Sequence, residues 1–252
     1  MNIRFDGRVV AVSGGAAGFG RAIAQRFATL GARVFTCDRD AEGLAGTASG
    51  TRITTALVDL SDRADAAGWI AGVERDTGGP LGVLVHNAGG TLGRPWRPIG
   101  EATDEDWDAI LAVNLNACFA LCRAAAPGMR RLQRGRIVTI SSTAGLRPSR
   151  TGIQAYTSAK HALVGLTRQL AAELGPDGIT VNSVAPGLIP STPEKMALWN
   201  ARDAADREAV LSGLALRHLA GVEDIVNATI FLASDLAGAI TGHVLPVNGG
   251  RL

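Results

Sequence analysis

Aromatic side chains are scarce in this chain of 252 residues: Phe, Trp and Tyr make up only 4%, and Tyr156 is the single tyrosine. The core must therefore be built mainly from Ala, Val, Leu and Ile, within the 46% of residues that are hydrophobic. This length and content suffice for one α/β domain with a large buried core, and no second domain is required. Glycine is abundant, at 32 residues, which indicates many tight turns and close backbone contacts.

An excess of charge of either sign is also lacking. The net charge of +2 is too small to indicate a nucleic-acid surface. The first residues show no charged leader followed by an apolar run and a cleavage site, and no apolar stretch looks long enough to span a bilayer. We therefore expect a soluble, cytoplasmic protein with no nucleic-acid partner and no membrane partner.

Cysteine is rare too, with three residues, Cys37, Cys118 and Cys122. An odd count fits a reducing compartment better than a disulfide framework. Cys118 and Cys122 would share one helical face, but no histidine or third thiol lies near them in the sequence. Two small core thiols are the favoured interpretation, with metal binding as the alternative, and we expect no metal site.

Short apolar runs alternate with helical patterns along the whole chain. The predicted strands cover residues 9–12, 34–37, 53–58, 83–85, 137–140, 180–185 and 244–247. The predicted helices cover residues 21–30, a segment from about 62, a segment from about 103 that stops near 126 before Pro127, and residues 155–174 and 222–234. This alternation indicates a doubly wound parallel sheet of about seven strands, with helices on both faces, in a single α/β domain spanning residues 1–252. A polar, helix-prone insert lies within about 188–216.

Residues suited to binding or catalysis lie where the predicted strands end. They are Gly14, Asp38, Asp59, Asn87, Ser142, Pro186 and Gly187. The carboxyl ends of parallel strands lie at one edge of a sheet, and open α/β sheets bind their ligands beyond that edge. The sequence therefore predicts one functional site at this edge.

A glycine turn follows the first strand and leads into a helix. The residues predicted to bind a ligand there are Gly14, Ala17, Gly18, Phe19 and Gly20. Glycines permit the sharp turn and let backbone N–H groups approach a pyrophosphate at the helix N-terminus. Strand, glycine turn and helix in this order are the context expected of a dinucleotide site, with a glycine-rich turn that binds nothing as the alternative.

Asp38 strengthens the dinucleotide interpretation, because it ends the second strand eighteen residues after Gly20. A carboxylate there accepts hydrogen bonds from a ribose diol and repels a 2′-phosphate, so we predict NAD over NADP. Arg39 follows directly and would weaken that preference. Helix capping is the alternative role for Asp38. Asp59, followed by Leu60, ends the third strand and would meet the adenine, with capping almost as plausible.

Tyr156 and Lys160 are four residues apart in a predicted helix and therefore face the same way. An ammonium near a phenol stabilises the phenolate and lowers the pKa of the tyrosine from about 10. Tyr156 would then act as general base in alcohol oxidation or as general acid in ketone reduction. Ser142, at the end of the fifth strand, would donate a hydrogen bond to the reacting oxygen. The alternatives are that Tyr156 and Lys160 are exposed surface residues without a function, and that Ser142 only forms the turn at the end of the strand.

The ordered set of motifs resembles the short-chain dehydrogenase/reductase family over essentially the whole chain. The matching residues are Gly14, Gly18, Gly20, Asn87, Ala88, Gly89, Asn114, Ser142, Tyr156, Lys160, Pro186 and Gly187. The resemblance implies a Rossmann-like fold, an NAD(P) cofactor, and a homotetramer or otherwise a dimer. The long helices carry the small residues Ala117, Ala162 and Gly165, which also suits packing against a second copy.

The resemblance also implies residue roles. Ser142, Tyr156 and Lys160 would be catalytic. Asn114 would support a water that links Lys160 to solvent, and Lys160 would also hold the nicotinamide ribose. The segment from Asn87 to Gly89 would flank the cofactor. Pro186 and Gly187, with Ile189 after them, would lie beside the nicotinamide carboxamide.

Several positions depart from the family pattern. Ser13 replaces the usual Thr and keeps a hydroxyl. Ser142 stands fourteen residues before Tyr156, where thirteen is common, which makes Thr143 a weak rival for its role. A hydroxyl usually follows the Pro-Gly segment, and both Ser191 and Thr192 fit that place.

Three loops are expected to border the substrate, at residues 90–100, 144–155 and 188–216. The substrate candidates in them are Arg94, Trp96, Arg147, Gln154 and Trp199. Arginines near a reaction centre would recognise a carboxylate or phosphate, with solvent-facing arginines as the alternative. Trp199 would belong to a lid over the substrate or would anchor the insert by packing.

The sequence thus predicts an oxidoreductase that transfers a hydride between NAD(H) and a secondary alcohol or ketone, a small-molecule substrate. One alternative is a 3-oxoacyl-thioester reductase, against which Asp38 argues because that activity favours NADP. The other is a non-catalytic NAD-binding sensor. A pure binding protein needs only the cofactor half of the site, so the presence of Asn114, Ser142, Tyr156 and Lys160 argues against it.

Overall fold

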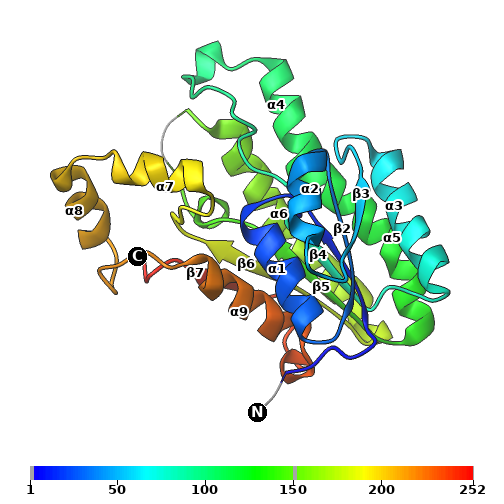
Figure 1. The fold of residues 1–252 in the computed structure, drawn as a ribbon. Coiled ribbons are helices and arrows are strands. Elements are labelled where there is room, and N and C mark those ends of the chain that lie inside the picture. Colours follow the sequence, from blue (N-terminus) through cyan, green and yellow to red (C-terminus); the bar gives the residue numbers. More distant parts are fainter. Residues whose placement is uncertain (1–2, 150–151, 252) are drawn as a thin grey trace.

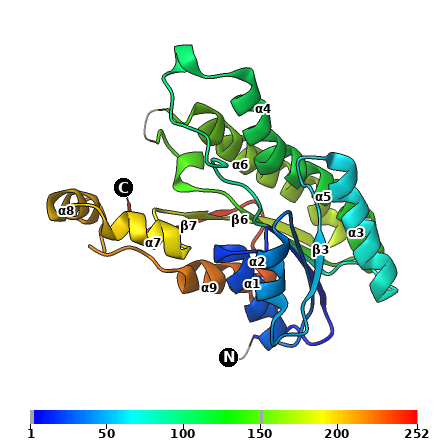
Figure 2. The same ribbon diagram turned by 45° about the horizontal axis from the view of Figure 1, so that its top comes forward.

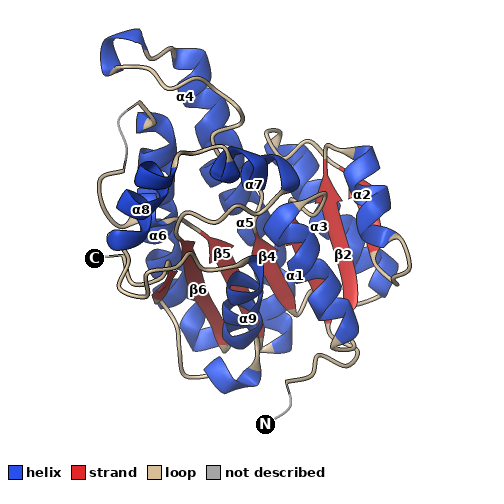
Figure 3. Ribbon diagram, turned by 60° about the vertical axis from the view of Figure 1, so that its left-hand side comes forward, coloured by secondary structure: helices blue, strands red, loops and turns tan. Residues whose placement is uncertain are grey.

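Short apolar runs form the strands of one parallel sheet in the computed structural model, which describes residues 3–149 and 152–251. The strands are β1 (Val9–Ser13), β2 (Arg33–Asp38), β3 (Thr54–Leu57), β4 (Val83–His86), β5 (Gly135–Ile140), β6 (Ile179–Pro186) and β7 (Val244–Val247). In the described residues they lie side by side in the order β3-β2-β1-β4-β5-β6-β7. Figure 3 shows β6, β5, β4 and β2 of this sheet from left to right. This is the doubly wound, Rossmann-like arrangement that the sequence predicted.

Helices cover both faces of the sheet, which explains why β4, β5 and β6 are buried along their whole length. The α-helices of the described residues are α1 (Gly18–Thr29), α2 (Ala41–Ala48), α3 (Arg63–Thr77), α4 (Asp104–Leu111), α5 (Ala117–Leu132), α6 (Gln154–Leu174), α7 (Pro193–Asn200), α8 (Ala204–Ser212) and α9 (Val222–Ala233). Figure 2 shows α3, α5 and α6 on one side of the sheet and α1 and α9 on the other.

Two hydrophobic cores result, one on each face. Ala11 of β1 packs with α3, α5 and α6, whereas its neighbours Val10 and Val12 pack with α1 and α9. This alternation is the two-residue period of a strand. Both cores are built from aliphatic side chains with few aromatic ones, as the composition requires.

The strand order reverses between β1 and β4, because β1 continues to β2 on one side while β4 continues to β5 on the other. Ser13 pairs with Cys37 across one side and with His86 across the other. The carboxyl ends of these strands therefore meet at the point where such sheets bind ligands. This reversal places the glycine turn, Asp38 and Asn87 next to one another.

The sequence-based helix ending near residue 126 was wrong. α5 runs through Pro127 to Leu132 and ends at Gln133, which adopts a left-handed conformation with φ 48°. Met129 explains the continuation, because it is fully buried and packs tightly against Gly135 of β5. Burial of that last turn outweighs the backbone hydrogen bond that proline removes.

The segment between α4 and α5 was predicted as plain helix but forms a π-helical turn, Ala112–Asn116. The short helix α2 was not predicted at all. Gly43 and Gly46 dilute its apolar pattern, although Asp40 caps it by accepting from the Gly43 N–H at 2.9 Å.

The expectation that no segment is long and apolar enough to cross a membrane was also wrong. Asp104–Leu132 is a continuous helical rod of 29 residues with a mean hydropathy of 1.6 in its most apolar window, and it meets that criterion by length and composition. Its length comes from the continuation through the π-helical turn and Pro127. Half of that window is buried inside the protein, and α5 packs in the core against α3 and α6.

The thiols of Cys118 and Cys122 lie in this same core, with their sulfur atoms 3.9 Å apart. Within residues 3–149 and 152–251, no three His, Cys, Asp or Glu side chains come together in a group that would hold a metal ion.

The insert after β6 forms α7 and α8, neither of which has a fully buried residue. Figure 1 shows the two helices (yellow and brown) extending as an arm from the body of the protein. The arm begins close to the glycine turn, because Ser191 Oγ lies beside Gly18 and accepts a hydrogen bond from Lys195 Nζ at 3.3 Å. Thr192 instead caps α7, accepting from the Lys195 N–H.

Candidate active site

The glycine turn folds tightly at the N-terminus of α1. Gly14 and Gly18 adopt positive φ values of 74° and 54°, which side chains disfavour. A Cβ at Gly14 would lie 2.7 Å from the Cα of Ala88, and one at Gly20 would collide with the carbonyl oxygen of Gly14. Each of the three predicted glycines is therefore required by φ or by a close contact.

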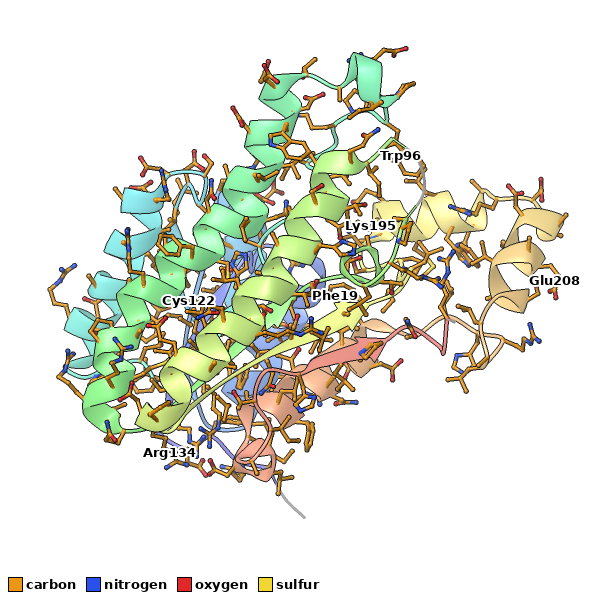
Figure 4. The ribbon with its side chains drawn as sticks, turned by 180° about the vertical axis from the view of Figure 1, so that it is seen from behind. Phe19, Trp96, Cys122, Arg134, Lys195 and Glu208 are labelled. Atoms are coloured by element: carbon orange, nitrogen blue, oxygen red, sulfur yellow. The ribbon has the colours of Figure 1, made fainter. Side chains whose placement is uncertain are left out.

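This cradle fits a pyrophosphate. Ala17 occupies the N-cap of α1 without a side-chain hydrogen bond to the helix, and no acidic residue stands in the first turn. The first N–H groups of α1 and the positive end of its dipole therefore point at the space beyond the turn. Phe19 packs partly against the core beside it (Figure 4).

Two side chains that the sequence analysis missed brace the turn, Thr47 from α2 and Arg21 from α1. Thr47 Oγ1 donates to the Gly15 carbonyl at 2.7 Å, and the Arg21 guanidinium donates to the carbonyls of Ala16 and Gly43. Gly15 is also required, because a Cβ there would collide with Thr36 Oγ1. The cap signal at Asp40 was the one feature that pointed to this helix.

Asp38 ends β2 beside the turn. Its carboxylate accepts the N–H of Ala16 at 3.2 Å and that of Arg39 at 2.8 Å, so the side chain is fixed in place. It does not cap α2, because Asp40 does so. Arg39 is exposed.

Asp59 belongs to a local turn. It accepts from the Ser61 N–H at 2.9 Å and the Ser61 hydroxyl at 2.7 Å, and these bonds hold the pKa of its carboxyl below the usual value. The cap of α3 is Asp62, so the capping alternative for Asp59 is wrong. Leu60 and Ile189 lie buried in the two cores rather than at the surface.

The segment after β4 binds the glycine turn directly. Asn87 Nδ2 donates to the Gly14 carbonyl at 2.9 Å, and the N–H groups of Asn87 and Ala88 donate to Ser13 Oγ at 3.1 and 3.2 Å. A Cβ at Gly89 would collide with Asn114 Oδ1 and would lie 3.5 Å from Lys160 Nζ. The segment thus touches both the cofactor cradle and the Tyr156 side of the site.

Asn114 sits in the π-helical turn and is fully buried. Its Nδ2 donates to the carbonyls of Gly90 at 2.9 Å and Ile110 at 2.8 Å, and its Oδ1 accepts from the Gly90 N–H at 2.9 Å. These three bonds lock the amide and fix the loop that follows Gly89.

Tyr156 and Ser142 meet across the site. Tyr156 is half-buried near the start of α6, and Ser142 stands before the 3-10 helix Thr143–Gly145. Burial raises the pKa of Tyr156, and the hydrogen bond from Ser142 opposes that rise. A serine hydroxyl that favours the phenolate donates to it.

Thr143 does not fill the same place. Its hydroxyl donates to the Pro186 carbonyl at 3.0 Å and ties the end of β6 to the loop after β5. Of the two candidate hydroxyls, it is therefore that of Ser142 that faces Tyr156.

Lys160 is almost fully buried, and its Nζ donates to the Ile140 carbonyl at 2.8 Å. Burial lowers the pKa of this amine to about 8. Nζ lies over the Tyr156 ring, 5.7 Å from its centre. The expected lowering of the Tyr156 pKa by Lys160 is not met in this arrangement, because the ammonium is directed to Ile140 rather than to the phenol oxygen.

A cleft adjoins Tyr156 between α4, the start of α6 and the loop after β4, and its wall includes Arg94, Arg97, Asp106, Trp107 and Gln154. Arg94 is paired with Asp106 at 2.9 Å and Glu105 at 3.2 Å. Gln154 Nε2 donates to the Arg97 carbonyl at 3.1 Å.

The other three substrate candidates do not form part of the wall of that cleft. Trp96 is largely exposed, although Pro95 and Arg97 on either side of it line the cleft (Figure 4). Arg147 lines a second cavity near the carboxyl-terminal segment. Trp199 lies on α7, where the Arg202 guanidinium stacks 5.5 Å from its ring centre.

The fold and the site together are typical of an oxidoreductase that uses a nicotinamide cofactor. The sheet is doubly wound, the glycine turn is open to a pyrophosphate, and Tyr156 meets Ser142 and lies close to Lys160. Comparison with known proteins gives the family. A family model described as enoyl-(acyl carrier protein) reductase matches residues 14–251. The chain belongs to the short-chain dehydrogenase/reductase family. It is therefore an NAD(P)-dependent enzyme that acts on alcohol or ketone groups of small molecules.

Two curated relatives span nearly the full length. The (2S)-[(R)-hydroxy(phenyl)methyl]succinyl-CoA dehydrogenase subunit BbsD of Thauera aromatica is 40% identical, over 97% of this chain and 96% of the relative. The 3-oxoacyl-[acyl-carrier-protein] reductase FabG of Escherichia coli is 34% identical, over 98% of both chains.

A solved structure also resembles the chain over its full length. The putative NAD(P)-dependent gluconate 5-dehydrogenase from Beutenbergia cavernae, with bound NADP at low occupancy, is 34% identical. Its TM-score is 0.89, and the match covers 100% of this chain and 99% of that one.

Proposed function

We propose that this enzyme interconverts a secondary alcohol and a ketone with NAD(H), using Tyr156 as the general acid or base. The observation that carries the proposal is the meeting of Ser142 with Tyr156 and the burial of Lys160 beside the tyrosine ring. The bound cofactor supplies the hydride acceptor or donor. Tyr156 takes the proton from the alcohol oxygen during oxidation and returns it during reduction.

Ser142 and Lys160 would serve the same reaction in different ways. Ser142 donates a hydrogen bond to the oxygen at which charge changes. Lys160 has three N–H donors, of which one goes to Ile140, and it would turn toward the nicotinamide ribose. Asn114 would support a water leading from Lys160 to solvent.

Replacing Ser142 by alanine is expected to lower kcat by roughly 10²-fold, the usual effect of losing one such donor. Thr143→Ala removes the neighbouring hydroxyl and is the matched control. It should leave kcat nearly unchanged and lower the thermal stability slightly, because it loses one hydrogen bond to Pro186. Steady-state kinetics and thermal unfolding of the two variants make the comparison. Equal losses of kcat would contradict the assignment of Ser142.

The proposed cofactor site combines the glycine turn with the ends of the neighbouring strands. Its members are Gly14, Ala17, Gly18, Phe19, Gly20, Asp38, Arg39, Asp59, Leu60, Asn87, Ala88, Gly89, Tyr156, Lys160, Pro186, Gly187 and Ile189. Buried Leu60 and Ile189 would contribute backbone atoms or the inner wall rather than exposed side chains.

We infer a preference for NAD from Asp38, whose carboxylate is fixed beside the turn by the backbone N–H groups of Ala16, Arg39 and Asp40. Asp38→Asn removes the charge and keeps an acceptor oxygen. A hydrogen bond to a charged group contributes about 1.5–3 kcal/mol, so kcat/KM with NAD should fall roughly 10- to 100-fold. The value with NADP should rise.

Asp40→Asn provides the control for Asp38→Asn, since it removes a charge two residues away and asparagine still caps α2. It should leave the NAD to NADP ratio unchanged. A wild-type enzyme that prefers NADP, or an unchanged ratio in Asp38→Asn, would overturn the inferred preference.

The substrate would enter the cleft beside Tyr156, where Arg94 and Gln154 form part of the wall. Trp96, Arg147 and Trp199 would contribute from the surrounding loops, and residues 188–216 would act as a lid. A purified-protein screen with NAD and NADP separately, against polyols, sugars, hydroxy acids, sterols and β-hydroxyacyl thioesters, tests this activity by nicotinamide absorbance.

A second candidate is reduction of a 3-oxoacyl thioester. The names of two relatives favour it, since BbsD is a dehydrogenase of a CoA thioester and FabG a reductase of an acyl-carrier thioester. In the screen, turnover of thioesters but not of the corresponding free hydroxy acids would select this candidate.

The assembly would be a homotetramer in the cytoplasm. Of the small helix residues suggested for subunit packing, Ala162 and Gly165 are exposed on α6, whereas Ala117 lies in the core. Phe119 of α5 is also exposed at 41%. The solution mass by light scattering tests the tetramer, and a monomer would reject it.

A further inference from the structure

His86 ends β4, is only 1% exposed, and has a hydrogen-bond partner on each ring nitrogen. Nδ1 lies 3.1 Å from Ser13 Oγ of β1, and Nε2 lies 3.3 Å from the backbone carbonyl oxygen of Asn114 in the π-helical turn. One buried side chain thus bridges the strand that leads into the glycine turn and the helix segment behind Lys160.

The contacts of Ser13 determine where the ring proton sits. Ser13 Oγ already accepts the N–H groups of Asn87 and Ala88, which occupy its two lone pairs. Its single proton must therefore be donated to His86 Nδ1, so that Nδ1 is an acceptor. The ring proton is then on Nε2 and is donated to the Asn114 carbonyl.

The surroundings keep this ring neutral. Burial, helped by the nearby Lys160 ammonium, lowers the pKa of His86 to about 3. The titratable groups on this side of the site are Lys160 and Tyr156 on α6 and Cys118 on α5. The Cys118 thiol interacts with Lys160. A neutral ring with one defined tautomer is consequently maintained across the working pH range.

The Asn114 segment controls the wall behind Lys160. The Asn114 amide is bonded to Gly90 in both directions, and Asn114 Oδ1 and Lys160 Nζ both crowd the same face of Gly89. Movement of the π-helical turn would therefore move the Gly89–Gly90 backbone and open the Lys160 pocket to bulk water.

We propose that His86 is a positioning residue, which holds the Asn114 carbonyl through its Nε2–H and thereby keeps the wall of the Lys160 pocket in place, so that bulk water does not enter beyond the one water that Asn114 would support. It couples the fit of the glycine turn, through Ser13, to the environment of the Tyr156–Lys160 pair. The proposal rests on the proposed function for its kinetic consequence, but the hydrogen-bond arrangement is independent of it.

Three substitutions distinguish the contribution of the Nε2 hydrogen bond of His86 from that of the Nδ1 hydrogen bond. His86→Gln places an amide N–H where Nε2 was and should retain kcat within about threefold. His86→Asn reaches only the Ser13 side, and His86→Leu fills the space without either bond. Both should lower kcat at least tenfold, change the KM for NAD less than twofold, and shift the alkaline limb of the pH profile upward, because hydration of Lys160 returns its pKa toward the ordinary value.

Circular dichroism and thermal unfolding establish that each variant is folded. If His86→Leu fails to fold, Ser13→Ala serves as the test instead. It removes the hydroxyl that donates to His86 Nδ1, so the tautomer of the unchanged His86 ring is no longer fixed, and the pH profile should shift in the same direction. Wild-type kcat and pH profile in folded His86→Asn and His86→Leu, or equal losses in His86→Gln and His86→Leu, would overturn the proposal.

A measurement without turnover distinguishes failure here from failure of the proposed function. Long-range ¹H–¹⁵N NMR of the imidazole in the wild-type protein should show Nε2 protonated and Nδ1 unprotonated, without titration between pH 5 and 9 as expected from the low pKa. An Nδ1-protonated or titrating ring would reject the His86 arrangement even in an active enzyme. An inactive enzyme with the expected spectrum would reject only the function.

Discussion

Tyr156→Phe is expected to lower kcat/KM by roughly 10²- to 10⁴-fold, the range that general acid–base catalysis contributes. The substitution removes one oxygen and keeps the ring that packs with Ile110 and Ala155, so the fold should be preserved. Tyr156 is the only tyrosine of the chain, and no other phenol can replace it. Binding of NAD, measured by calorimetry, should change little, because the glycine turn and Asp38 are untouched.

Ser158→Ala is the control for Tyr156→Phe. It removes a hydroxyl from the same turn of α6, but from an exposed position two residues away that faces the other side of the helix. Its kinetics should match those of the wild type. Persistence of turnover in Tyr156→Phe would contradict the mechanism. If the wild type binds NAD but turns over no alcohol or ketone, the non-catalytic sensor becomes the better interpretation.

The fold was predictable because its signals are local. The inner strands contain short apolar runs, and glycine or a polar residue follows most of these runs, so both the strands and their parallel arrangement follow from the sequence. The errors lie where packing overrides a local rule. Pro127 stays within α5 because Met129 is buried beyond it, and α2 forms beside the glycine turn although its glycines disfavour a helix.

The site was predictable to the level of residue types at strand ends and at helical spacing. Glycines at a turn, an acid after β2 and a Tyr–Lys pair four residues apart are visible without a structure. What spacing could not show is which atoms meet. Ser142 and Thr143 are adjacent in the sequence, yet one faces Tyr156 and the other Pro186. Lys160 was expected at the phenol oxygen and instead donates to Ile140.

His86 is a residue whose contacts the sequence did not indicate at all. In the sequence it follows Val83, Leu84 and Val85 and looks like the end of a buried strand. Its partners come from β1 and the π-helical turn, 73 and 28 residues away, and the turn itself leaves no local signal. Contacts that join distant segments through backbone carbonyls carry no residue-type requirement on the partner, so sequence patterns do not reveal them.

Gly20→Ala should have the second large effect, on cofactor binding. The added Cβ would collide with the Gly14 carbonyl and would lie 2.5 Å from Asn87 Nδ2, so the turn must move away from α1. Overpacking of this kind destabilises proteins by about 1–3 kcal/mol. Because the same movement disturbs the N–H groups that face the pyrophosphate, we expect at least about a tenfold rise in the Kd for NAD.

Gly68→Ala is the matched control for Gly20→Ala. Gly68 is an exposed helical glycine of α3 with no atom within 4 Å of the added Cβ. Alanine there should raise the free energy of unfolding by up to about 1 kcal/mol, since it has the higher helix propensity, and should leave NAD binding unchanged. Thermal unfolding with and without NAD reads out both effects. If Gly20→Ala bound NAD as tightly as Gly68→Ala, the close contact between α1 and the glycine turn would not be what shapes the cofactor site, and the pyrophosphate would have to be held elsewhere.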